Sequence, residues 1–528
     1  MPKKRIIVCD AIHNKGFELL ENSSDIEYTD ASEMPKEKLL EIVGDYDVAI
    51  TRSSTDVDEK FLNAAKSLKA IVRAGVGVDN VDIEGCSKRG IIVMNVPTAN
   101  TIAAVELTMA HMLAAARSFP NANNHLKLDR IWKREKWYGI ELKDKKLGII
   151  GFGNIGSRVG KRALAFEMDV FAYDPYIDPS KAIDLGVTYT KNFDDILDCD
   201  FITIHTPKNH ETINMISYDE IAKMKDGVRL INCARGGLYN EDALYEGLKS
   251  GKIAYAGIDV FVKEPATDNK LLDLENISVT PHLGANTFES QEKIATQAVE
   301  QAINAARGIS FPNALNLPVR ENELPEFVKP YLELTQKLGY LAAQINVGAI
   351  KSLKVEAEGE IAYYLDSLTT FALVGSLKES MGEKINYVNA EFVAQENGIE
   401  LRHARAREIS EYKNRVEVKV ITDEKSIEIG GTIFSDTIEK IININKIKLD
   451  FKPKGKMIFF SNLDRPGVIM KISQILAERG INIADFRLGR DRKGEALAVV
   501  LVDEAVDKEV LKAFESLEEC NWVSYAVL

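Results

Sequence analysis

The chain has 528 residues, enough for about three to four domains, and its composition of 45% hydrophobic and 28% charged residues is ordinary for a soluble globular protein. The formal net charge of -13 argues against broad nucleic-acid binding, because binding phosphates requires a basic face. Five scattered cysteines without a CxxC pair favour reduced thiols over disulfides or a metal site. With no signal peptide and no apolar run near the ~20 residues of a membrane span, we expect a cytoplasmic protein without membrane contact.

Strand-like runs alternate with helical patterns from residue 4 to residue 95. The runs cover residues 5–9, 48–51, 70–73 and 91–94, and a helical pattern at 37–43 precedes the second run. This alternation predicts a parallel sheet covered by helices. The region has no GxGxxG motif, so we do not expect it to bind a nucleotide.

A long helical pattern at 101–117 leads into a polar, aromatic segment at 121–138. Trp132 and Trp137 in this segment have two equally good explanations. They pack against another subunit, or they form a satellite cluster within one subunit.

Three glycines in GxGxxG spacing, Gly151, Gly153 and Gly156, follow an apolar run that reads as a buried strand. In this motif the first glycine permits a tight turn, the second lets a pyrophosphate approach the backbone, and the third lets the next helix pack closely. A second apolar run, 168–174, ends at Asp174, near the spacing of ~20 residues expected for a ribose-binding carboxylate. The pattern predicts a dinucleotide site.

Four further strand-like runs, at 201–205, 229–233, 254–259 and 277–280, each end in a polar loop, and a helix at 290–307 follows. Arg235, Glu264 and His282 lie in three of these loops. Each alone has a structural explanation, such as a turn cap, a loop dipeptide or a buried histidine. Together, beside a dinucleotide motif, they indicate a dehydrogenase, in which a histidine takes the proton of an alcohol, a carboxylate orients the histidine and an arginine binds a carboxylate.

The C-terminal half shows no constellation of catalytic residues. Residues 319–452 have alternating strand and helix patterns, and a structural or regulatory role is the preferred interpretation. Strands at 457–460, 484–488, 496–502 and 523–527 with helices at 468–478 and 508–517 spell βαββαβ, the ferredoxin-like arrangement.

On the GxGxxG stretch and the loops of Arg235, Glu264 and His282, the sequence resembles the D-isomer-specific 2-hydroxyacid dehydrogenases, most closely the long form of the D-3-phosphoglycerate dehydrogenases. The resemblance implies an α/β protein with a flavodoxin-like substrate domain (1–98, completed by 288–318) and a Rossmann NAD-binding domain (99–287). An α+β intervening domain (319–452) follows, by position more than by motif. The βαββαβ segment (456–528), with the stretches 462–467 and 479–482, is similar to ACT regulatory domains.

The resemblance also assigns roles to residues. His282 is the acid/base, with Arg235 and Glu264 as its catalytic partners. NAD is bound by a set of residues around the strand ends: Gly151, Gly153, Asn154, Ile155, Gly156, Asp174, Thr206, Cys233, Ala234, Asp259 and Gly284.

For the substrate, the resemblance implies a carboxylate on the backbone turn at Val76 and Gly77, and a distal phosphate on Arg52, Arg73 and Asn100. The alternative for Arg52 and Arg73 is a solvated surface role. The resemblance further suggests that Arg130 and Lys133 reach a neighbouring subunit of a homodimer or homotetramer. In the ACT-like segment it maps an L-serine effector onto Asn462, Asp464 and Asn482, and the alternative is a plain oligomerisation domain.

We therefore expect NAD-dependent oxidation of 3-phospho-D-glycerate to 3-phosphohydroxypyruvate, the entry to serine synthesis, with feedback by serine. Two alternatives stay open. One is a dehydrogenase of another D-2-hydroxyacid, such as glycerate or 2-hydroxyglutarate. The other is a nucleotide-sensing binding protein of the same fold without enzymatic activity.

Overall fold

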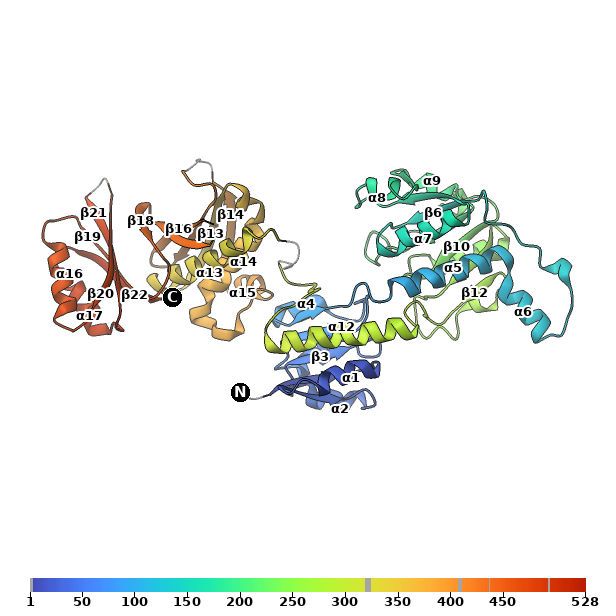
Figure 1. The fold of residues 1–528 in the computed structure, drawn as a ribbon, viewed down its shortest axis with the longest axis horizontal. Helices are drawn as coiled ribbons and strands as arrows, with labels where there is room; N and C mark the ends of the chain where they lie inside the picture. The colour runs from blue at the N-terminus through green and yellow to red at the C-terminus, as the bar shows by residue number, and fades with distance from the viewer. Residues whose placement is uncertain (1–2, 319–323, 407–410, 436, 492–493) are drawn as a thin grey trace.

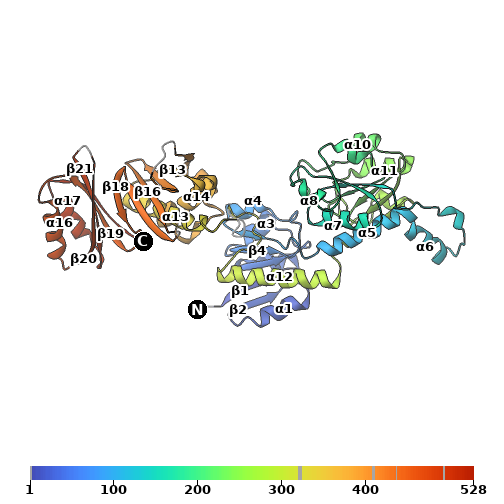
Figure 2. The same cartoon turned by 45° about the horizontal axis from the view of Figure 1, so that its top comes forward.

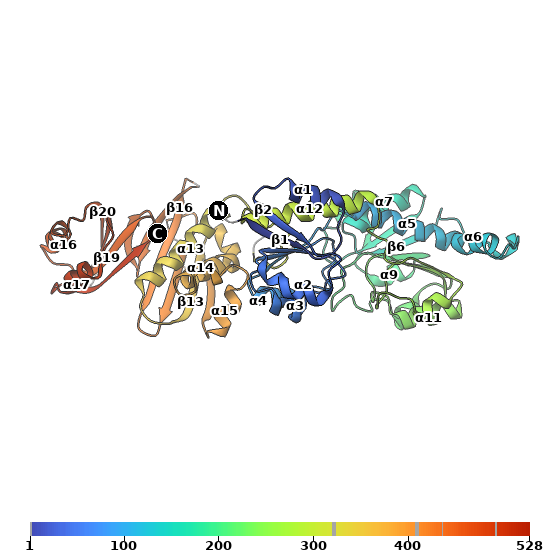
Figure 3. The ribbon, with the colours of Figure 1, turned by 90° about the horizontal axis from the view of Figure 1, so that it is seen from below.

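The computed structural model describes residues 3–318, 324–406, 411–435, 437–491 and 494–528. Its helices and strands form four modules, each built on one β-sheet and numbered here by the order of those sheets in the chain. The modules lie in a row in the order fourth, third, first, second, and the chain crosses between the first two modules just before α5 (Thr101–Arg117) and again before α12 (Phe288–Arg307) (Figures 1, 2 and 3).

The first module is a five-stranded parallel sheet in the order β2-β1-β3-β4-β5, the flavodoxin-like order that the sequence predicted. Its strands are β1 (Lys4–Val8), β2 (Ile26–Asp30), β3 (Val48–Thr51), β4 (Ala70–Arg73) and β5 (Ile92–Met94). Its helices are α1 (Asn14–Glu21), α2 (Lys36–Ile42), α3 (Glu59–Ala64), α4 (Ile83–Lys88) and α12. The predicted helix at 290–307 is thus confirmed as α12, which returns the chain to this module and packs on its sheet.

The second module is a seven-stranded parallel sheet in the order β12-β11-β10-β9-β6-β7-β8, a Rossmann arrangement with one added strand. Its strands are β6 (Lys146–Ile150), β7 (Asp169–Tyr173), β8 (Thr188–Thr190), β9 (Phe201–Ile204), β10 (Val228–Asn232), β11 (Ile253–Ile258) and β12 (Ile277–Val279). Its helices are α5, α6 (Phe119–Lys127), α7 (Asn154–Ala165), α8 (Ser180–Ile183), α9 (Phe193–Leu197), α10 (Tyr218–Lys223) and α11 (Glu241–Ser250). The strand order reverses between β6 and β9, and in such sheets ligands bind at the carboxyl ends beside that point.

The third module is a mixed sheet in the order β14-β13-β15-β16-β17-β18, with helices packed on one face. Its elements are α13 (Val328–Ile345), β13 (Ile350–Glu358), α14 (Leu365–Met381), α15 (Ala390–Glu396), β14 (Glu400–Arg405), β15 (Arg415–Thr422), β16 (Ser426–Phe434), β17 (Ile438–Ile444) and β18 (Ile447–Phe451). It contacts the first module through Asn386, whose side-chain amide donates to the carbonyl of Gly90 at 2.8 Å, and through Val388, which joins the first module's core.

The fourth module has the predicted ferredoxin-like βαββαβ order, with an antiparallel sheet β20-β21-β19-β22. Its elements are β19 (Lys456–Leu463), α16 (Val468–Ala477), β20 (Ile483–Arg490), β21 (Glu495–Val502), α17 (Lys508–Glu515) and β22 (Cys520–Val527). One sheet face packs on α16 and α17, and the other, with Met457 and Phe459, shares the apolar core of the third module. The third and fourth modules are therefore continuous in their packing.

The predicted boundary at residue 319 begins a segment, 319–323, that lies outside the described residues. No helix within the described ranges is long and apolar enough to cross a bilayer.

Candidate active site

The GxGxxG turn connects β6 to α7, and each glycine meets a different steric demand. Gly151 has a φ of +86°, which a residue with a side chain rarely adopts. A Cβ on Gly156 would lie 2.1 Å from the carbonyl oxygen of Gly151, so only glycine lets α7 approach the turn this closely. A Cβ on Gly153 would meet nothing within 4 Å, and this open side is where a phosphate has room to approach the backbone.

The start of α7 is free to bind an anion. Asn154 and Ile155 are its first residues, and Gly153 at the N-cap position supplies no side chain to accept from their N–H groups. Unpaired N–H groups and the helix dipole make such a start a favourable place for phosphate. The predicted roles of Asn154 and Ile155 are compatible with this geometry.

Asp174, just after β7, is oriented beside the turn by two backbone hydrogen bonds. Its carboxylate accepts from the N–H of Phe152 and from the N–H of Tyr176, both at 2.9 Å. Each carboxylate oxygen keeps a further lone pair, so the group can still accept hydrogen bonds from ribose hydroxyls.

A cavity of about 450 Å³ lies between the ends of β6, β7 and β9, at the point where the strand order reverses. Gly151, Gly153, Asp174 and Thr206 line it as predicted. Sequence reasoning missed Tyr176 and other lining residues, whose only signal was that they follow strand ends: Pro175, His205, Pro207, Asn209, Glu211, Thr212 and Met215. Within the described chain, the hydroxyl of Thr206 and Nδ1 of His205 are buried without a hydrogen-bond partner, so the cavity suits a polar ligand such as a dinucleotide.

The remaining predicted cofactor residues, Cys233, Ala234, Asp259 and Gly284, gather at the ends of β10, β11 and β12. The carboxylate of Asp259 accepts from the N–H of Gly284 at 2.9 Å and from the N–H of Leu283 at 2.7 Å. A Cβ on Gly284 would lie 3.3 Å from that carboxylate and 3.8 Å from the carbonyl oxygen of Cys233. Asp259 thus organises the loop that carries His282.

His282 and Glu264 form the hydrogen-bonded pair that the sequence predicted. Nδ1 of His282 lies 2.8 Å from Oε2 of Glu264, and Oε1 of Glu264 accepts from the N–H of Phe261 at 3.0 Å. The hydrogen bond to Glu264 raises the pKa of His282 despite partial burial of the ring. Burial alone would raise the pKa of Glu264, but the hydrogen bond from His282 lowers it overall. Nε2 of His282 has no partner among the described residues and can take a proton.

Arg235 reaches from the second module to the first. Its Nε lies 3.1 Å from Oδ2 of Asp79, and its NH1 donates to the carbonyl of Ala234 at 2.7 Å. A Cβ on Gly77 would lie 2.3 Å from NH2 of Arg235, so glycine is required for this approach. The structure brings Arg235 against the predicted carboxylate turn, where the side-chain amide of Asn95 donates to the carbonyl of Val76 at 2.7 Å.

Arg52 directly follows β3, and Arg73, the last residue of β4, lies close to both Arg52 and Arg235. Arg52 donates from NH2 to Gln291 at 2.8 Å, and Arg73 donates from NH2 to Ser53 at 3.0 Å. Burial, together with the charges of Arg235 and Arg52, lowers the pKa of Arg73 to about 10. Nε of Arg73 is buried and has no hydrogen-bond partner among the described residues. The cluster therefore favours the binding of an anion.

The resemblance also singled out Asn100 for the phosphate, and Arg130 and Lys133 for contact with a neighbouring subunit. Asn100 is half-buried at the start of α5, and within the described ranges no side-chain hydrogen bond joins it to the arginines. Arg130 and Lys133 are exposed in the segment after α6, among exposed apolar side chains such as Trp132.

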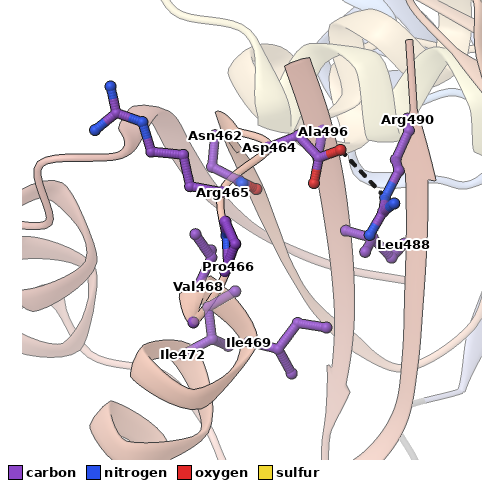
Figure 4. A pocket seen from close by; sticks show the side chains of 11 residues that line it. Asn462, Asp464, Arg465, Pro466, Val468, Ile469, Ile472, Leu488, Arg490 and Ala496 are labelled. Atoms are coloured by element: carbon purple, nitrogen blue, oxygen red, sulfur yellow. Dashed lines mark ion pairs between the residues drawn. The ribbon is translucent and has the colours of Figure 1, made fainter. Parts of the chain in front are cut away.

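In the fourth module, a cavity of about 340 Å³ lies between the start of α16 and the ends of β19 and β20 (Figure 4). Asn462 and Asp464 line it as predicted, and Oδ1 of Asn462 is buried without a partner in the described chain. Sequence reasoning missed Arg490, which lies 3.4 Å from Asp464 across the cavity (Figure 4). Asn482 precedes β20, at the opposite end of that strand, and donates to Asp503 at 2.6 Å.

Family models match three parts of the chain. Residues 109–284 match the model for the NAD binding domain of D-isomer specific 2-hydroxyacid dehydrogenases, 327–445 that for the D-3-phosphoglycerate dehydrogenase intervening domain, and 456–519 that for the ACT domain. The second module is thus an NAD-binding domain, the third an intervening domain and the fourth an ACT domain.

Full-length relatives agree with this assignment. The D-3-phosphoglycerate dehydrogenase of Archaeoglobus fulgidus is 39% identical over 99% of this chain and 100% of its own length. That of Bacillus subtilis is 38% identical over 98% of both chains. Among solved structures, a protein from Thermus thermophilus covers 59% of this chain and 99% of its own (TM-score 0.54, 32% identity). The D-lactate dehydrogenase of Aquifex aeolicus, complexed with NAD and lactic acid, covers 58% of this chain and 96% of its own (TM-score 0.51, 30% identity). The chain belongs to the D-3-phosphoglycerate dehydrogenase family of D-isomer specific 2-hydroxyacid dehydrogenases.

Proposed function

We propose that the chain oxidises 3-phospho-D-glycerate to 3-phosphohydroxypyruvate with NAD, as the first step of phosphorylated serine biosynthesis in the cytoplasm. The modules then correspond to a substrate domain (1–98 with 288–318), an NAD domain (99–287), an intervening domain (319–452) and an ACT domain (456–528). The names of the full-length relatives and the site geometry support this activity over that of a nucleotide sensor.

The observation that carries the choice of substrate is the arginine cluster where the first and second modules meet. Arg52, Arg73 and Arg235 lie near enough to one another for their charges to lower the pKa of Arg73. Nε of Arg73 is buried and unpaired in the described chain. A substrate with a carboxylate at one end and a dianionic phosphate at the other would give these groups anionic partners, whereas glycerate would supply no anion to Arg52 and Arg73.

The roles of the residues follow from their positions. Arg235 and the backbone at Val76 and Gly77 hold the carboxylate of the substrate and place its hydroxyl beside His282. Nε2 of His282 takes the hydroxyl proton, and Glu264 at Nδ1 stabilises the imidazolium that forms. Bound NAD supplies the hydride acceptor. Asp174 holds the ribose hydroxyls, and the start of α7 binds the pyrophosphate.

The activity is tested with the purified full chain and NAD by following NADH absorbance. The panel contains 3-phospho-D-glycerate, D-glycerate and D-2-hydroxyglutarate. We expect kcat/KM for the phosphorylated acid to exceed that for glycerate by at least about tenfold, because one charge-assisted hydrogen bond contributes roughly 1.5 to 3 kcal/mol. A higher kcat/KM on either unphosphorylated acid overturns the choice of substrate. NAD binding without turnover of any of them supports the sensor.

The segment around α6 supports a homo-oligomer, and we propose a homodimer or homotetramer. Four large apolar side chains there are mostly exposed: Phe119 (68%), Leu128 (68%), Trp132 (79%) and Tyr138 (87%). A second subunit that covers them removes this apolar surface from water and brings Arg130 and Lys133 to a neighbouring site. Sedimentation of the wild type against Trp132→Glu measures this contact, and a wild-type monomer at micromolar concentration excludes it.

We also propose L-serine as an effector at the cavity of the ACT domain. Asp464 can pair with the ammonium of an amino acid, and the unpaired Oδ1 of Asn462 can accept from it. Asn482 lies at the other end of β20, which is an edge strand. Antiparallel pairing of two β20 strands places Asn482 of one subunit beside the cavity of the other, which accounts for all three predicted residues.

Serine regulation is tested on the full chain by titrating L-serine against the rate of 3-phospho-D-glycerate oxidation. We expect inhibition at millimolar serine or below, and a weaker response in Asp464→Asn. Glu509→Gln, an exposed carboxylate on α17, serves as the control and keeps the wild-type response. If wild type and Asp464→Asn respond equally, the effector site lies elsewhere.

A further inference from the structure

A buried histidine on α5, His111, lies beneath the active-site loop. It is 4% exposed, and its ring lies between the hydroxyl groups of Ser278, in β12, and Thr280, two residues before His282. Nδ1 lies 2.9 Å from Oγ of Ser278, and Nε2 lies 2.9 Å from Oγ1 of Thr280. Thr280 in turn donates to Oδ1 of Asp259 at 2.6 Å.

We propose that His111 is a positioning residue for the dehydrogenase reaction, which acts through Thr280 and Asp259 to fix the nicotinamide end of the cofactor site and the loop of His282. The inference rests on the proposed function, because it assigns a role within that site. His111 itself touches neither substrate nor cofactor in this scheme.

The hydrogen bonds determine which ring nitrogen carries the proton. Thr280 uses its one hydroxyl proton on the carboxylate of Asp259, so it can only accept from His111. Nε2 of His111 must therefore carry a proton. Burial lowers the pKa of His111 to about 4, so the ring is neutral near pH 7, and Nδ1 accepts from the hydroxyl of Ser278. Each group in this series of hydrogen bonds therefore donates to the next, from Ser278 through His111 and Thr280 to Asp259.

Asp259 connects these hydrogen bonds to the loop that carries His282. Its carboxylate accepts from the N–H groups of Leu283 and Gly284, and its backbone carbonyl accepts from the N–H of His282 at 2.9 Å. His282 has a φ of +56°, a left-handed conformation that is unfavourable for a residue with a side chain. Such a conformation persists only where surrounding contacts hold it, and three of those contacts go to Asp259.

The fold leaves a specific place for the histidine ring. A Cβ on Gly257 of β11 would lie 2.7 Å from Cβ of His111 and 3.1 Å from its Cγ and Nδ1. The ring therefore packs directly on β11, the strand that precedes Asp259. A leucine would fill a similar volume, so packing alone does not require a polar ring there, and a buried polar group is costly unless its hydrogen bonds are used.

The position of Asp259 predicts which ligands should bind more weakly when His111 is replaced. Asp259 accepts from the loop of His282, and Asp174 accepts from the GxGxxG turn. In the proposed function the nicotinamide lies at the first place and the adenosine ribose at the second. A disturbed Asp259 should weaken binding of NADH, which has the nicotinamide, and spare ADP-ribose, which lacks it. Both ligands are titrated without a hydroxyacid, so this result does not depend on which acid the enzyme oxidises.

The test compares His111→Leu, which removes both hydrogen bonds, with His111→Gln, which retains a donor toward Thr280. For His111→Leu we expect kcat/KM to fall about tenfold, the equivalent of ~1.4 kcal/mol and the scale of one buried hydrogen bond. The Kd of NADH should rise about five- to tenfold, and the Kd of ADP-ribose should stay within about twofold of wild type. His111→Gln should recover kcat/KM to within about threefold of wild type.

Two further variants separate positioning from general stability. Thr280→Val removes the next hydrogen bond in the same series. The loss of kcat/KM in the double variant His111→Leu/Thr280→Val should therefore be no greater than the larger of the two single-variant losses. The single variant Thr280→Val also tests the inference if His111→Leu fails to fold. Tyr239→Phe is the matched control, since it removes a fully buried hydroxyl of the same domain that donates to the carbonyl of Ile231 at 3.0 Å. It should lower Tm and leave the kinetics unchanged.

The inference is overturned if His111→Leu lowers Tm as Tyr239→Phe does and leaves kcat/KM and the Kd of NADH unchanged. It is also overturned if affinities for NADH and ADP-ribose fall together, or if the losses of the two single variants add in the double variant. A wild type that oxidises a different acid would refute the proposed substrate but leave the NADH and ADP-ribose comparison intact.

Discussion

The first and second modules both place a glycine-containing turn at the carboxyl end of a parallel strand, but the two turns are built to hold anions in different ways. After β6, the glycines expose backbone N–H groups and the start of α7, and Gly153 has open space on its Cβ side. After β4, the glycines make room for charged side chains. A Cβ on Gly75 would collide with NH1 of Arg73, and one on Gly77 would collide with NH2 of Arg235.

This difference separates two tasks. The second module combines backbone recognition of a cofactor with the pair His282 and Glu264, so it carries the chemistry. The first module contributes Arg52 and Arg73, which can bind an anion but have no group able to move a proton near neutral pH. Mutations at His282, Glu264 or the cofactor turn should therefore change kcat or cofactor binding, and mutations at Arg52 or Arg73 should change the affinity for substrate.

The largest effect should come from His282→Ala. Loss of the general base should lower kcat about 10²- to 10⁴-fold, while NAD binding stays near that of the wild type because the cofactor cavity is untouched. Steady-state kinetics and an NADH titration measure the two parts. A loss of NADH affinity as large as the loss of kcat would show that the second module does not separate binding from chemistry in this way.

The next effect should come from Arg52→Ala. It removes a charge-assisted contact to the phosphate, so kcat/KM for 3-phospho-D-glycerate should fall about ten- to a hundredfold, mostly through KM. The kcat/KM for D-glycerate should hardly change. Arg307→Ala, which breaks an exposed pair with Asp25 in the same module, is the control for general damage. Equal losses on both acids would remove the distinction between the modules.

A smaller effect should come from Asp174→Asn in the cofactor cavity. In the proposed function the carboxylate accepts from ribose hydroxyls and repels the 2′-phosphate of NADP, so the substitution should reduce kcat/KM for NAD about tenfold and improve that for NADP. The ratio of the two values is the measurement. An unchanged preference for NAD would place the discrimination on residues other than Asp174.

The sequence predicted most strands of both α/β modules, including the edge strands β5 and β12, but it missed one edge strand in each sheet. β2 and β8 were not predicted, and each lies at one end of its sheet. Central strands are apolar on both faces and stand out as continuous runs, whereas Ile26–Asp30 and Thr188–Thr190 are largely polar and bury little. The hydrophobic pattern that reveals a strand is weakest where the strand buries few side chains.

The site shows a similar limit. Arg235, Glu264 and His282 were predictable because each follows a strand in the same sheet, and the carboxyl ends of parallel strands meet at one edge. Arg490 and His111 were not. Their contacts to Asp464 and Thr280 join segments distant in the chain, and nothing in the local pattern distinguishes a histidine on an apolar helix face from a core residue. Such partners become visible only when the packing is known.

The smallest effect, and the most direct test of the chemistry in the second module, concerns the pH dependence of Glu264→Gln. The hydrogen bond from His282 to Glu264 raises the pKa of His282 above its ordinary value near 6.5. Oxidation requires the neutral ring, so kcat/KM falls as the pH drops through that pKa. Without the carboxylate the imidazolium is less stable, the pKa of His282 falls, and the acidic limb of the profile should move to lower pH.

The plateau of kcat/KM at high pH should also change. At high pH, where His282 is neutral in both forms, Glu264→Gln should be slower than the wild type because the imidazolium formed during proton transfer has lost its partner. A profile of kcat/KM from about pH 5 to pH 9 records both changes. Asp226→Asn, which removes a carboxylate paired with Lys252 at the opposite, amino-terminal edge of the same sheet, should leave the limb in place. Removing a neighbouring carboxylate destabilises an imidazolium and so lowers its pKa. If the acidic limb of Glu264→Gln does not move, or moves to higher pH, the base is not His282 paired with Glu264.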